Sequence, residues 1–390
     1  MNAEFYEKFP HLNFQYDWKI DNNTSYLFGK CEELVKVISN TPILPEHYEK
    51  LKLVSFKKGA RATTAIEGNT LTEADIDNLM KSDKIPASKE YQILEVTNII
   101  DKFNELVDDV IIRDKSERIT PELIKEFHRS IGKNLGNDFK AIPGRFAQSN
   151  RVVGSYKCPD NIYIEQLVNE FCNWSFEKFQ YFQNSKEYTF LNAFIHSIAT
   201  HLYIEWIHPF DDGNGRTGRM LEFFILLRGG VPDIASHILS NYYNDTRSEY
   251  YRQIDLARNN SNLTSFIKYA LIGFYEGLEQ ILITIHKGQK QVIWQKYIYD
   301  EFSDMQMSKR VKERKRALLM YIGIEEEFIA QDLMSIHPKI SAAYANENLR
   351  TMQRDIDELF SNNFLKKLPG NFYMINDSIL KGYLPIKKSR

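Results

Sequence analysis

The chain has 390 residues, which is enough for two or three domains of ordinary size. Hydrophobic residues make up 43% of it and charged residues 26%, as in an ordinary soluble globular protein with a large core. The formal net charge of −2 excludes a global electrostatic attraction to nucleic acids or membranes, so partners have to be inferred from local features.

The cysteines are too few for a disulfide framework, and they lack the paired spacing of a zinc site: Cys31, Cys158 and Cys172. The first residues show no basic start followed by an apolar run, so no secretory signal is predicted. No stretch reaches about 18 consecutive apolar residues, so no membrane span is expected. We therefore expect a cytoplasmic protein with no membrane partner.

Apolar residues recur at helical spacing through most of the chain. The spacing predicts helices over residues 48–66, 191–206 and 263–285. Thr72 followed by Asp75 is typical of a capping box that opens a further helix. Residues 220–227 are almost wholly apolar, which indicates a helix that is buried on all sides.

One segment interrupts this helical pattern. Between Leu135 and Tyr163, turn-forming residues flank short β-prone pieces such as Arg151-Val152-Val153, which predicts a loop that contains a hairpin. Long irregular segments inside a compact helical domain often have a function.

The chain changes character after about residue 307. A basic run over residues 309–316 precedes helical patterns near 317–321, 330–335 and 347–362. Two β-prone pieces then flank the turn Pro369-Gly370-Asn371. Three helices and a hairpin within about 80 residues predict a winged helix-turn-helix.

The most informative stretch lies between two of the apolar helices. It reads His208-Pro209-Phe210-Asp211-Asp212-Gly213-Asn214-Gly215-Arg216-Thr217-Gly218-Arg219. Pro209 disfavours helix at the residue before it, so the first helix should end by Ile207 and the second should begin near Gly215. The free N–H groups and positive dipole end of that second helix form an anion site. Gly213 and Gly215 let the backbone approach a phosphate closely.

The charged residues of this stretch supply the other parts of a reactive site. Arg216 and Arg219 lie three positions apart and can fork onto phosphate oxygens. Asp212 offers a hard carboxylate to Mg²⁺, which usually arrives with substrate phosphates. His208 is a base of near-neutral type. Phosphoryl or nucleotidyl transfer needs these parts and little else, because positioning and charge stabilisation dominate.

The same residues also allow plainer interpretations. Gly213, Gly215 and Gly218 formally spell the dinucleotide-binding pattern, but that pattern must follow a strand, and here it follows a helical segment. A structural turn would explain the glycines and not the histidine, aspartate and arginines around them. His196 and His201 do not form a metal-binding motif, so we expect them to be satisfied core histidines.

The stretch from His208 to Arg219 resembles the signature of the Fic family, H-P-F-x-[DE]-G-N-G-R-x-x-R, at every fixed position. The resemblance covers roughly residues 55–275. It implies an all-helical core with a small hairpin, ATP as co-substrate and Mg²⁺. It also implies that His208 takes the proton from a Ser, Thr or Tyr hydroxyl of a target protein, or of the chain itself, which then receives AMP.

The resemblance assigns the other residues of the motif as well. Asp212 corresponds to the Mg²⁺ ligand, and Asn214 with the backbone of Gly213 and Gly215 lines an anion hole for the α-phosphate. Arg216 and Arg219 correspond to the residues that hold the β- and γ-phosphates. Phe210 is apolar, and we expect it to anchor the loop in the core.

Two neighbouring segments also resemble parts of the family. Arg151-Val152-Val153-Gly154 corresponds to a hairpin flap that docks the target backbone as an added strand. Tyr250 and Tyr251 resemble a tyrosine pair near the adenine pocket, although two tyrosines in a helix serve packing as often as stacking.

An upstream segment, Thr63-Thr64-Ala65-Ile66-Glu67-Gly68-Asn69, resembles the inhibitory motif of the family, [ST]-x-x-x-E-[GN]. In this reading Glu67 pairs with Arg219 and occupies the space of the γ-phosphate, so that inhibition acts in cis from an N-terminal helix. The alternative is a helix that simply ends in a glycine cap.

These expectations divide the chain into an N-terminal helical region with the inhibitory helix (1–110), a Fic core (111–300) and a winged helix-turn-helix (301–390). Residues 350–359 resemble a recognition helix, which predicts DNA or protein contact. Asp355, Asp357 and Glu358 weaken the case for DNA. The other functions left open are transfer from another nucleotide donor, removal of AMP, and DNA-binding regulation with the Fic core as a sensor.

Overall fold

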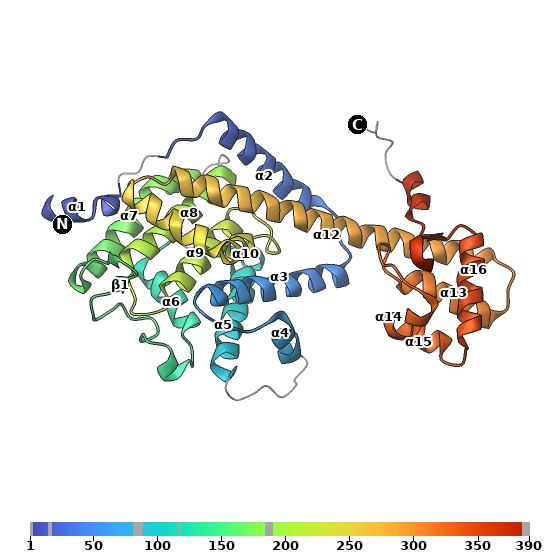
Figure 1. Cartoon of the computed structure of the whole chain (residues 1–390). Helices are drawn as coiled ribbons and strands as arrows, with labels where there is room; N and C mark the ends of the chain where they lie inside the picture. The colour runs from blue at the N-terminus through green and yellow to red at the C-terminus, as the bar shows by residue number, and fades with distance from the viewer. Residues whose placement is uncertain (1–2, 15–17, 81–88, 116–117, 184–189, 384–390) are drawn as a thin grey trace. The chain divides into compact units, whose positions relative to one another are not determined.

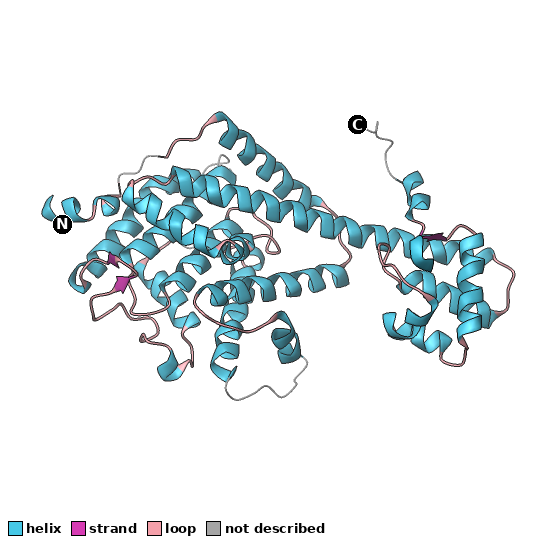
Figure 2. Cartoon of the chain, viewed as in Figure 1, coloured by secondary structure: helices cyan, strands magenta, loops and turns pink. Residues whose placement is uncertain are grey.

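The computed structural model describes residues 3–14, 18–80, 89–115, 118–183 and 190–383 (Figure 1). The described residues are mainly helical, and their strands form two small antiparallel hairpins (Figure 2). This agrees with the expected helical core and small hairpin. The chain forms two compact units, residues 1–282 and 283–390, and the boundary falls inside helix α12 (Thr264–Asp304). None of the helices in the described ranges has the length and hydrophobicity needed to cross a membrane.

The first unit contains α12 up to residue 282 and eleven preceding α-helices within the described residues. These are α1 (Ala3–Lys8), α2 (Asn22–Asn40), α3 (Pro45–Ile66), α4 (Glu73–Met80), α5 (Glu90–Val107), α6 (Pro121–Ile131), α7 (Ile164–Gln183), α8 (Phe190–Ile207), α9 (Asn214–Arg228), α10 (Ile238–Asp245) and α11 (Arg247–Asn259).

Helices α8 and α9 pack against each other at the centre of this unit. Helix α8 also contacts α2 and α7, and α9 also contacts α3 and α6. Every residue of α9 from Asn214 to Leu227 is buried, which confirms the helix predicted to be buried on all sides. The loop that carries the motif therefore joins the two most enclosed helices, and such a setting holds side chains rigidly.

Helix α3 packs against α9, the helix that begins inside the motif. Gly59 lies so close to His237 that a Cβ would come within 2.7 Å of it, so this face of α3 tolerates no side chain there. The helix ends at Ile66, and Gly68 follows in a left-handed conformation with φ 103°. The predicted capping box is present, because Thr72 Oγ1 accepts from the Asp75 N–H at 3.1 Å and Asp75 Oδ2 accepts from the Thr72 N–H at 2.9 Å.

The predicted hairpin lies between α6 and α7. Strand β1 (Val152–Val153) pairs with β2 (Tyr156–Lys157), with Val152 opposite Lys157 and Val153 opposite Tyr156. Gly154 turns the chain between the two strands with φ 58°, a conformation that favours glycine.

The second unit has its own core. Its helices after α12 are α13 (Lys309–Tyr321), α14 (Leu333–Ile336), α15 (Pro338–Tyr344) and α16 (Leu349–Ser361), followed by strands β3 (Leu365–Lys367) and β4 (Tyr373–Ile375). Its buried residues include Trp294 of α12, Leu318 of α13 and Ile356 of α16. Helix α13 begins eight residues before the expected start at 317, and α15 was not predicted. The N-terminal half of α13 is strongly basic, so its hydrophobic residues do not show a helical spacing in the sequence.

Candidate active site

The motif forms a closed loop between α8 and α9. Helix α8 ends at Ile207 and α9 begins at Asn214, as the proline and glycines predict. Asn214 closes the loop, since its Oδ1 accepts from the Phe210 N–H and its Nδ2 donates to the Phe210 carbonyl, both at 2.8 Å. The side chain assigned to the anion hole is therefore used inside the loop. Its backbone N–H lies in the first turn of α9, where N–H groups lack an intrahelical acceptor and can bind an anion.

His128 of α6 packs against this loop and bonds to its backbone. No sequence pattern predicted this residue. Its ring stacks on the buried Phe210 ring with a centroid distance of 3.7 Å and an interplanar angle of 4°. Its Nδ1 accepts from the Gly144 N–H at 2.9 Å, so the Nε2–H donates to the Asp212 carbonyl, also at 2.9 Å. Burial lowers the pKa of His128 to about 4, which keeps the ring neutral and this hydrogen-bond pattern fixed.

His208 has the geometry of a base. The side chain is half-buried, and the backbone at His208 is in the left-handed region, with φ 51°. Its Nδ1 lies 3.3 Å from the backbone carbonyl oxygen of Glu205. A carbonyl oxygen only accepts, so Nδ1 carries the proton and Nε2 keeps a lone pair. Burial lowers the pKa of His208, and the negative charge of Glu205 opposes that shift. The ring is therefore held in the unprotonated state that a base needs.

Arg151 supports the backbone of His208. It donates from Nε to the His208 carbonyl at 2.9 Å, from Nη1 to Ser149 and from Nη2 to Pro159, and its side chain is buried. Within the segment assigned to the target flap, Arg151 thus points into the protein. Val152 and Val153 face outward, with 63% and 42% of their surfaces exposed.

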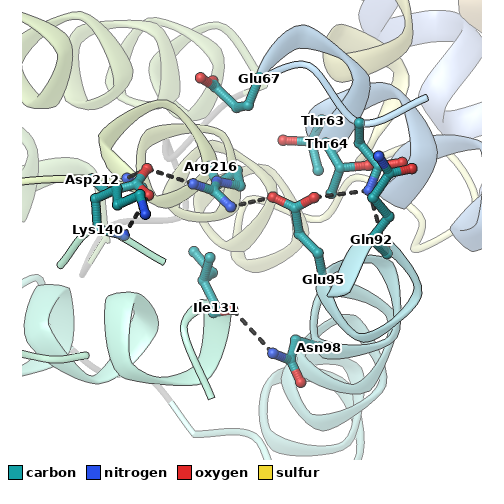
Figure 3. A network of polar contacts seen from close by, with 12 residues as sticks. Thr63, Thr64, Glu67, Gln92, Glu95, Asn98, Ile131, Lys140, Asp212 and Arg216 are labelled. Carbon is teal, nitrogen blue, oxygen red and sulfur yellow. Dashed lines mark hydrogen bonds and ion pairs between the residues drawn. The ribbon is translucent and has the colours of Figure 1, made fainter. Parts of the chain in front are cut away.

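The Arg216 guanidinium lies between two carboxylates, those of Asp212 and Glu95 (Figure 3). Its Nη2 donates to Asp212 Oδ1 at 2.7 Å, and its Nη1 donates to Glu95. Glu95 belongs to α5 and is 4% exposed. No sequence motif links α5 to the loop between α8 and α9, so Glu95 was not predicted.

Glu95 also connects Arg216 to the inhibitory segment. Its Oε2 accepts from Asn69 Nδ2 at 2.8 Å, and Asn69 Nδ2 also donates to the Gln92 carbonyl at 2.9 Å. Burial raises the pKa of Glu95 above its usual value, and the positive charge of Arg216 opposes that rise only in part. A chain of polar contacts therefore runs from the end of α3 through α5 to the first turn of α9.

Asp212 is the carboxylate at the entrance to α9. Its Oδ1 accepts from the Gly213 N–H at 2.6 Å, and its Oδ2 accepts from the Lys140 N–H at 3.0 Å. Among the described residues, no group of three or more His, Cys, Asp or Glu side chains is arranged to hold a metal ion. A single carboxylate at an anion site fits Mg²⁺ that arrives with phosphates, since Mg²⁺ usually keeps several waters and takes one or two carboxylates.

Arg219 is bound by the inhibitory segment. Its Nη2 donates to Glu67 Oε1 at 2.5 Å and to the Thr63 carbonyl at 3.0 Å, and its Nε donates to Thr63 Oγ1 at 2.7 Å. The pairing of Glu67 with Arg219 that the sequence predicted is present. The Glu67 carboxylate also covers Gly215, where an added Cβ would overlap Oε1. It therefore occupies the anion site at the N-terminus of α9.

The two tyrosines assigned to the adenine pocket differ in their surroundings. Tyr250 is 1% exposed, and its hydroxyl lies 3.2 Å from Arg219 Nη1 and 2.9 Å from His201 Nε2. Tyr251 is 42% exposed, and its hydroxyl donates to the Ile66 carbonyl at 3.4 Å. Only Tyr251 presents a ring surface to an incoming base.

These features agree with a comparison against protein families. Residues 118–226 match the model of the Fic/DOC family, and the matched range contains the whole motif from His208 to Arg219. Over this range the chain is similar to Fic/DOC domains. The inhibitory segment and the second unit lie outside the matched range.

Individual relatives agree with this assignment. The chain is 29% identical over 209 residues to a protein adenylyltransferase Fic of Nematostella vectensis, covering 53% of this chain and 44% of that protein. It is 26% identical over 209 residues to protein adenylyltransferase fic-1 of Caenorhabditis elegans, covering 53% and 37%. The chain thus spans less than half the length of these curated relatives.

The fold recurs in solved structures. A Fic family protein from Desulfovibrio desulfuricans aligns with a TM-score of 0.57 at 19% identity, over 93% of this chain and 98% of that chain. Residues 134–508 of Fic-1 from C. elegans align with a TM-score of 0.52 at 21% identity, over 67% and 72%.

Proposed function

We propose that this chain transfers AMP from ATP to a Ser, Thr or Tyr hydroxyl of a protein, its own or another, and that Glu67 holds it in an inhibited state. The observation that carries the proposal is the Glu67–Arg219 ion pair over the first turn of α9, beside a base, a carboxylate and a second arginine. The names of the relatives, protein adenylyltransferase Fic, support the reaction type.

Binding of the nucleotide falls to α9. In this proposal the N–H groups of its first turn bind the α-phosphate, and Arg216 and Arg219 hold the β- and γ-phosphates. Asp212 would hold the Mg²⁺ that accompanies the triphosphate, and the ion would neutralise charge on the phosphate oxygens. Asp212 is already 26% exposed, so it can turn from Arg216 to this ligand without unpacking the core.

His208 carries the proton transfer. The target hydroxyl gives its proton to His208 Nε2, and its oxygen forms a bond to the α-phosphorus. The bond between the α-phosphorus and the bridging oxygen breaks, and pyrophosphate leaves. The Glu205 carbonyl holds Nδ1–H and so stabilises the imidazolium that forms, in the manner of an orienting acceptor.

The inhibited state follows from competition for one cation. Arg219 is fully buried, and Glu67 already neutralises it. A γ-phosphate brought to the same place meets a like charge in a partly dry cleft, which is costly at low effective dielectric. ATP then binds only in a pose that is not productive.

Labelling with α-³²P-ATP and Mg²⁺ tests the reaction. The full chain with Glu67→Gly should label itself or proteins of a lysate, and the double variant Glu67→Gly, His208→Ala should label neither. Label from γ-³²P-ATP in place of α-³²P-ATP would show phosphate transfer and contradict the proposal. Release of AMP from labelled protein without net labelling would support the reverse reaction.

We also infer that the second unit is a winged helix whose α16 contacts a protein partner. The order of α13, a bridge between Phe328 and Tyr373, α15, α16 and the β3–β4 hairpin supports the fold. Its basic run is partly neutralised, because Arg314 pairs with Asp355 and Glu347, and Lys315 pairs with Glu358. This charge pairing favours protein over DNA.

Fluorescence anisotropy of a labelled DNA duplex tests the choice of partner. The full chain should show no salt-dependent binding, because salt dependence measures phosphate contacts. Salt-dependent binding that Arg350→Glu abolishes would favour DNA instead.

A further inference from the structure

The contacts of Arg219 fall into two groups. Its Nε and Nη2 bond to Thr63 and Glu67, which both belong to the inhibitory segment. Its Nη1 bonds to Tyr250 of α11, at 3.2 Å. When the nucleotide displaces the inhibitory segment, the contact to Tyr250 is the one of these that remains.

Tyr250 is itself held by a buried polar network. His201 Nε2 lies 2.9 Å from the Tyr250 hydroxyl, and His201 Nδ1 lies 3.2 Å from Glu222 Oε1. A carboxylate only accepts, so His201 Nδ1 carries a proton. The Tyr243 hydroxyl donates to the same Glu222 oxygen at 2.9 Å. All four side chains are buried, so the hydroxyl of Tyr250 has a fixed place against Arg219.

We propose that Tyr250, held by His201 and Glu222, is the positioning residue that keeps Arg219 aimed at the triphosphate when Glu67 has left. The proposal rests on the proposed function, in which Arg219 holds the β- and γ-phosphates. This role differs from the expectation that Tyr250 contacts the adenine base. A ring that is 1% exposed and lies between His201, Tyr243 and Phe266 has no free face on which a base can stack.

The distinction between phosphate and adenine gives a direct test. Affinities for Mg·ATP and for AMP are measured by calorimetry on the full chain carrying Glu67→Gly and His208→Ala, which removes the inhibitory carboxylate and prevents turnover. AMP shares the base and the α-phosphate with ATP and lacks the phosphates that Arg219 holds. Adding Tyr250→Phe should weaken Mg·ATP binding about ten-fold, the scale of one hydrogen bond to a charged group, and leave AMP binding unchanged.

Tyr243→Phe is the matched control. It removes a hydroxyl of equal burial from the same Glu222, but it leaves the bonds from Glu222 through His201 to Tyr250 and from Tyr250 to Arg219 in place, so both affinities should stay unchanged. A second variant, His201→Gln, keeps the Tyr250 hydroxyl and removes the imidazole that holds it, and should weaken Mg·ATP alone, by about three-fold.

Three outcomes would overturn the proposal. They are unchanged Mg·ATP affinity in Tyr250→Phe, an equal loss for Mg·ATP and AMP, or an equal loss in Tyr243→Phe. Because binding is measured without turnover, the absence of protein labelling would count against the proposed function and leave this result intact. If Tyr250→Phe does not fold, as judged by the loss of a cooperative thermal unfolding transition, the His201→Gln result decides.

Discussion

Glu95 and Arg216 form a buried ion pair that joins α5 to the first turn of α9. The Arg216 guanidinium also lies 5.2 Å from the centre of the Phe139 ring, so it is enclosed by a carboxylate on each side and an aromatic ring. Taking charges out of water is expensive, and only close pairing offsets the cost. The pair therefore fixes the position of the arginine that we propose to bind phosphate, and it makes the neighbours of Arg216 sensitive to mutation.

We expect Glu95→Ala to destabilise the first unit by about 3 kcal/mol, because it leaves the Arg216 charge buried with Asp212 as its remaining partner. Urea unfolding followed by tryptophan fluorescence measures this. The control is Asn98→Ala, one turn further along α5. Asn98 donates to the carbonyls of Ile131 and Lys133. Its removal leaves no buried charge without a partner, so the free energy of unfolding should fall by about 1 kcal/mol. Equal losses in the two variants would contradict the role assigned to the ion pair.

The pH dependence of labelling should report His208. Burial lowers its pKa, so the base stays unprotonated below the ordinary histidine value of about 6.5. In the Glu67→Gly variant the labelling rate should be level from pH 8 to about 6.5 and should fall only at more acidic pH. A midpoint above the ordinary value would mean that the Glu205 charge outweighs burial.

The stability of the fold should depend on His128 in acid. Its pKa is lowered to about 4 in the folded protein, and the unfolded chain takes up the proton first as pH falls. The contribution is therefore complete above about pH 6.5 and is lost on acidification toward pH 4, at up to about 1.4 kcal/mol per pH unit. His128→Gln should reduce the slope of unfolding free energy against pH in that window. An unchanged slope would show that other buried histidines account for it.

The sequence predicted the parts of the site that depend on local rules. Pro209 ends α8, the glycines open α9, and the hydrophobic spacing places both helices in the core. The pairing of Glu67 with Arg219 followed from the resemblance alone, since about 150 residues separate them and no local rule joins them.

The missed residues share a physical cause. Glu95 and His128 act through contacts between elements that are distant in sequence, and each lies in a helix where its residue type is ordinary. Tyr250 was predicted, but as an adenine contact and not as the partner of Arg219. Arg151 was assigned to the target flap because it precedes two β-prone residues. It lies just before β1, and its buried guanidinium bonds instead to backbone carbonyls such as that of His208, a contact that no local pattern predicts.

The contact between Glu67 and Arg219 can inhibit in two ways, by the negative charge of the carboxylate and by the space that it fills over Gly215. Substitutions at Glu67 distinguish the two. Glu67→Gly removes both, so labelling should rise about tenfold or more, since each 1.4 kcal/mol of relieved repulsion is about a factor of ten. Glu67→Gln keeps the size and the hydrogen bond to Arg219 and removes the negative charge. We expect an intermediate rate, because the amide still covers Gly215 but no longer neutralises the cation that the γ-phosphate needs.

Thr63→Ala completes the series, since it removes the hydroxyl that accepts from Arg219 Nε and leaves Glu67 in place. Losing one hydrogen bond to a charged group should raise labelling by about tenfold at most, and by less than Glu67→Gly does. Initial rates of label incorporation at fixed Mg·ATP give the order, with thermal unfolding as the check that each variant is folded. A Glu67→Gln rate equal to wild type would mean that inhibition is steric, and a rate equal to Glu67→Gly would mean that it is electrostatic. If Glu67 only ended a helix, folded Glu67→Gly protein would label no faster than wild type, because a lost helix end weakens the fold and frees no cation.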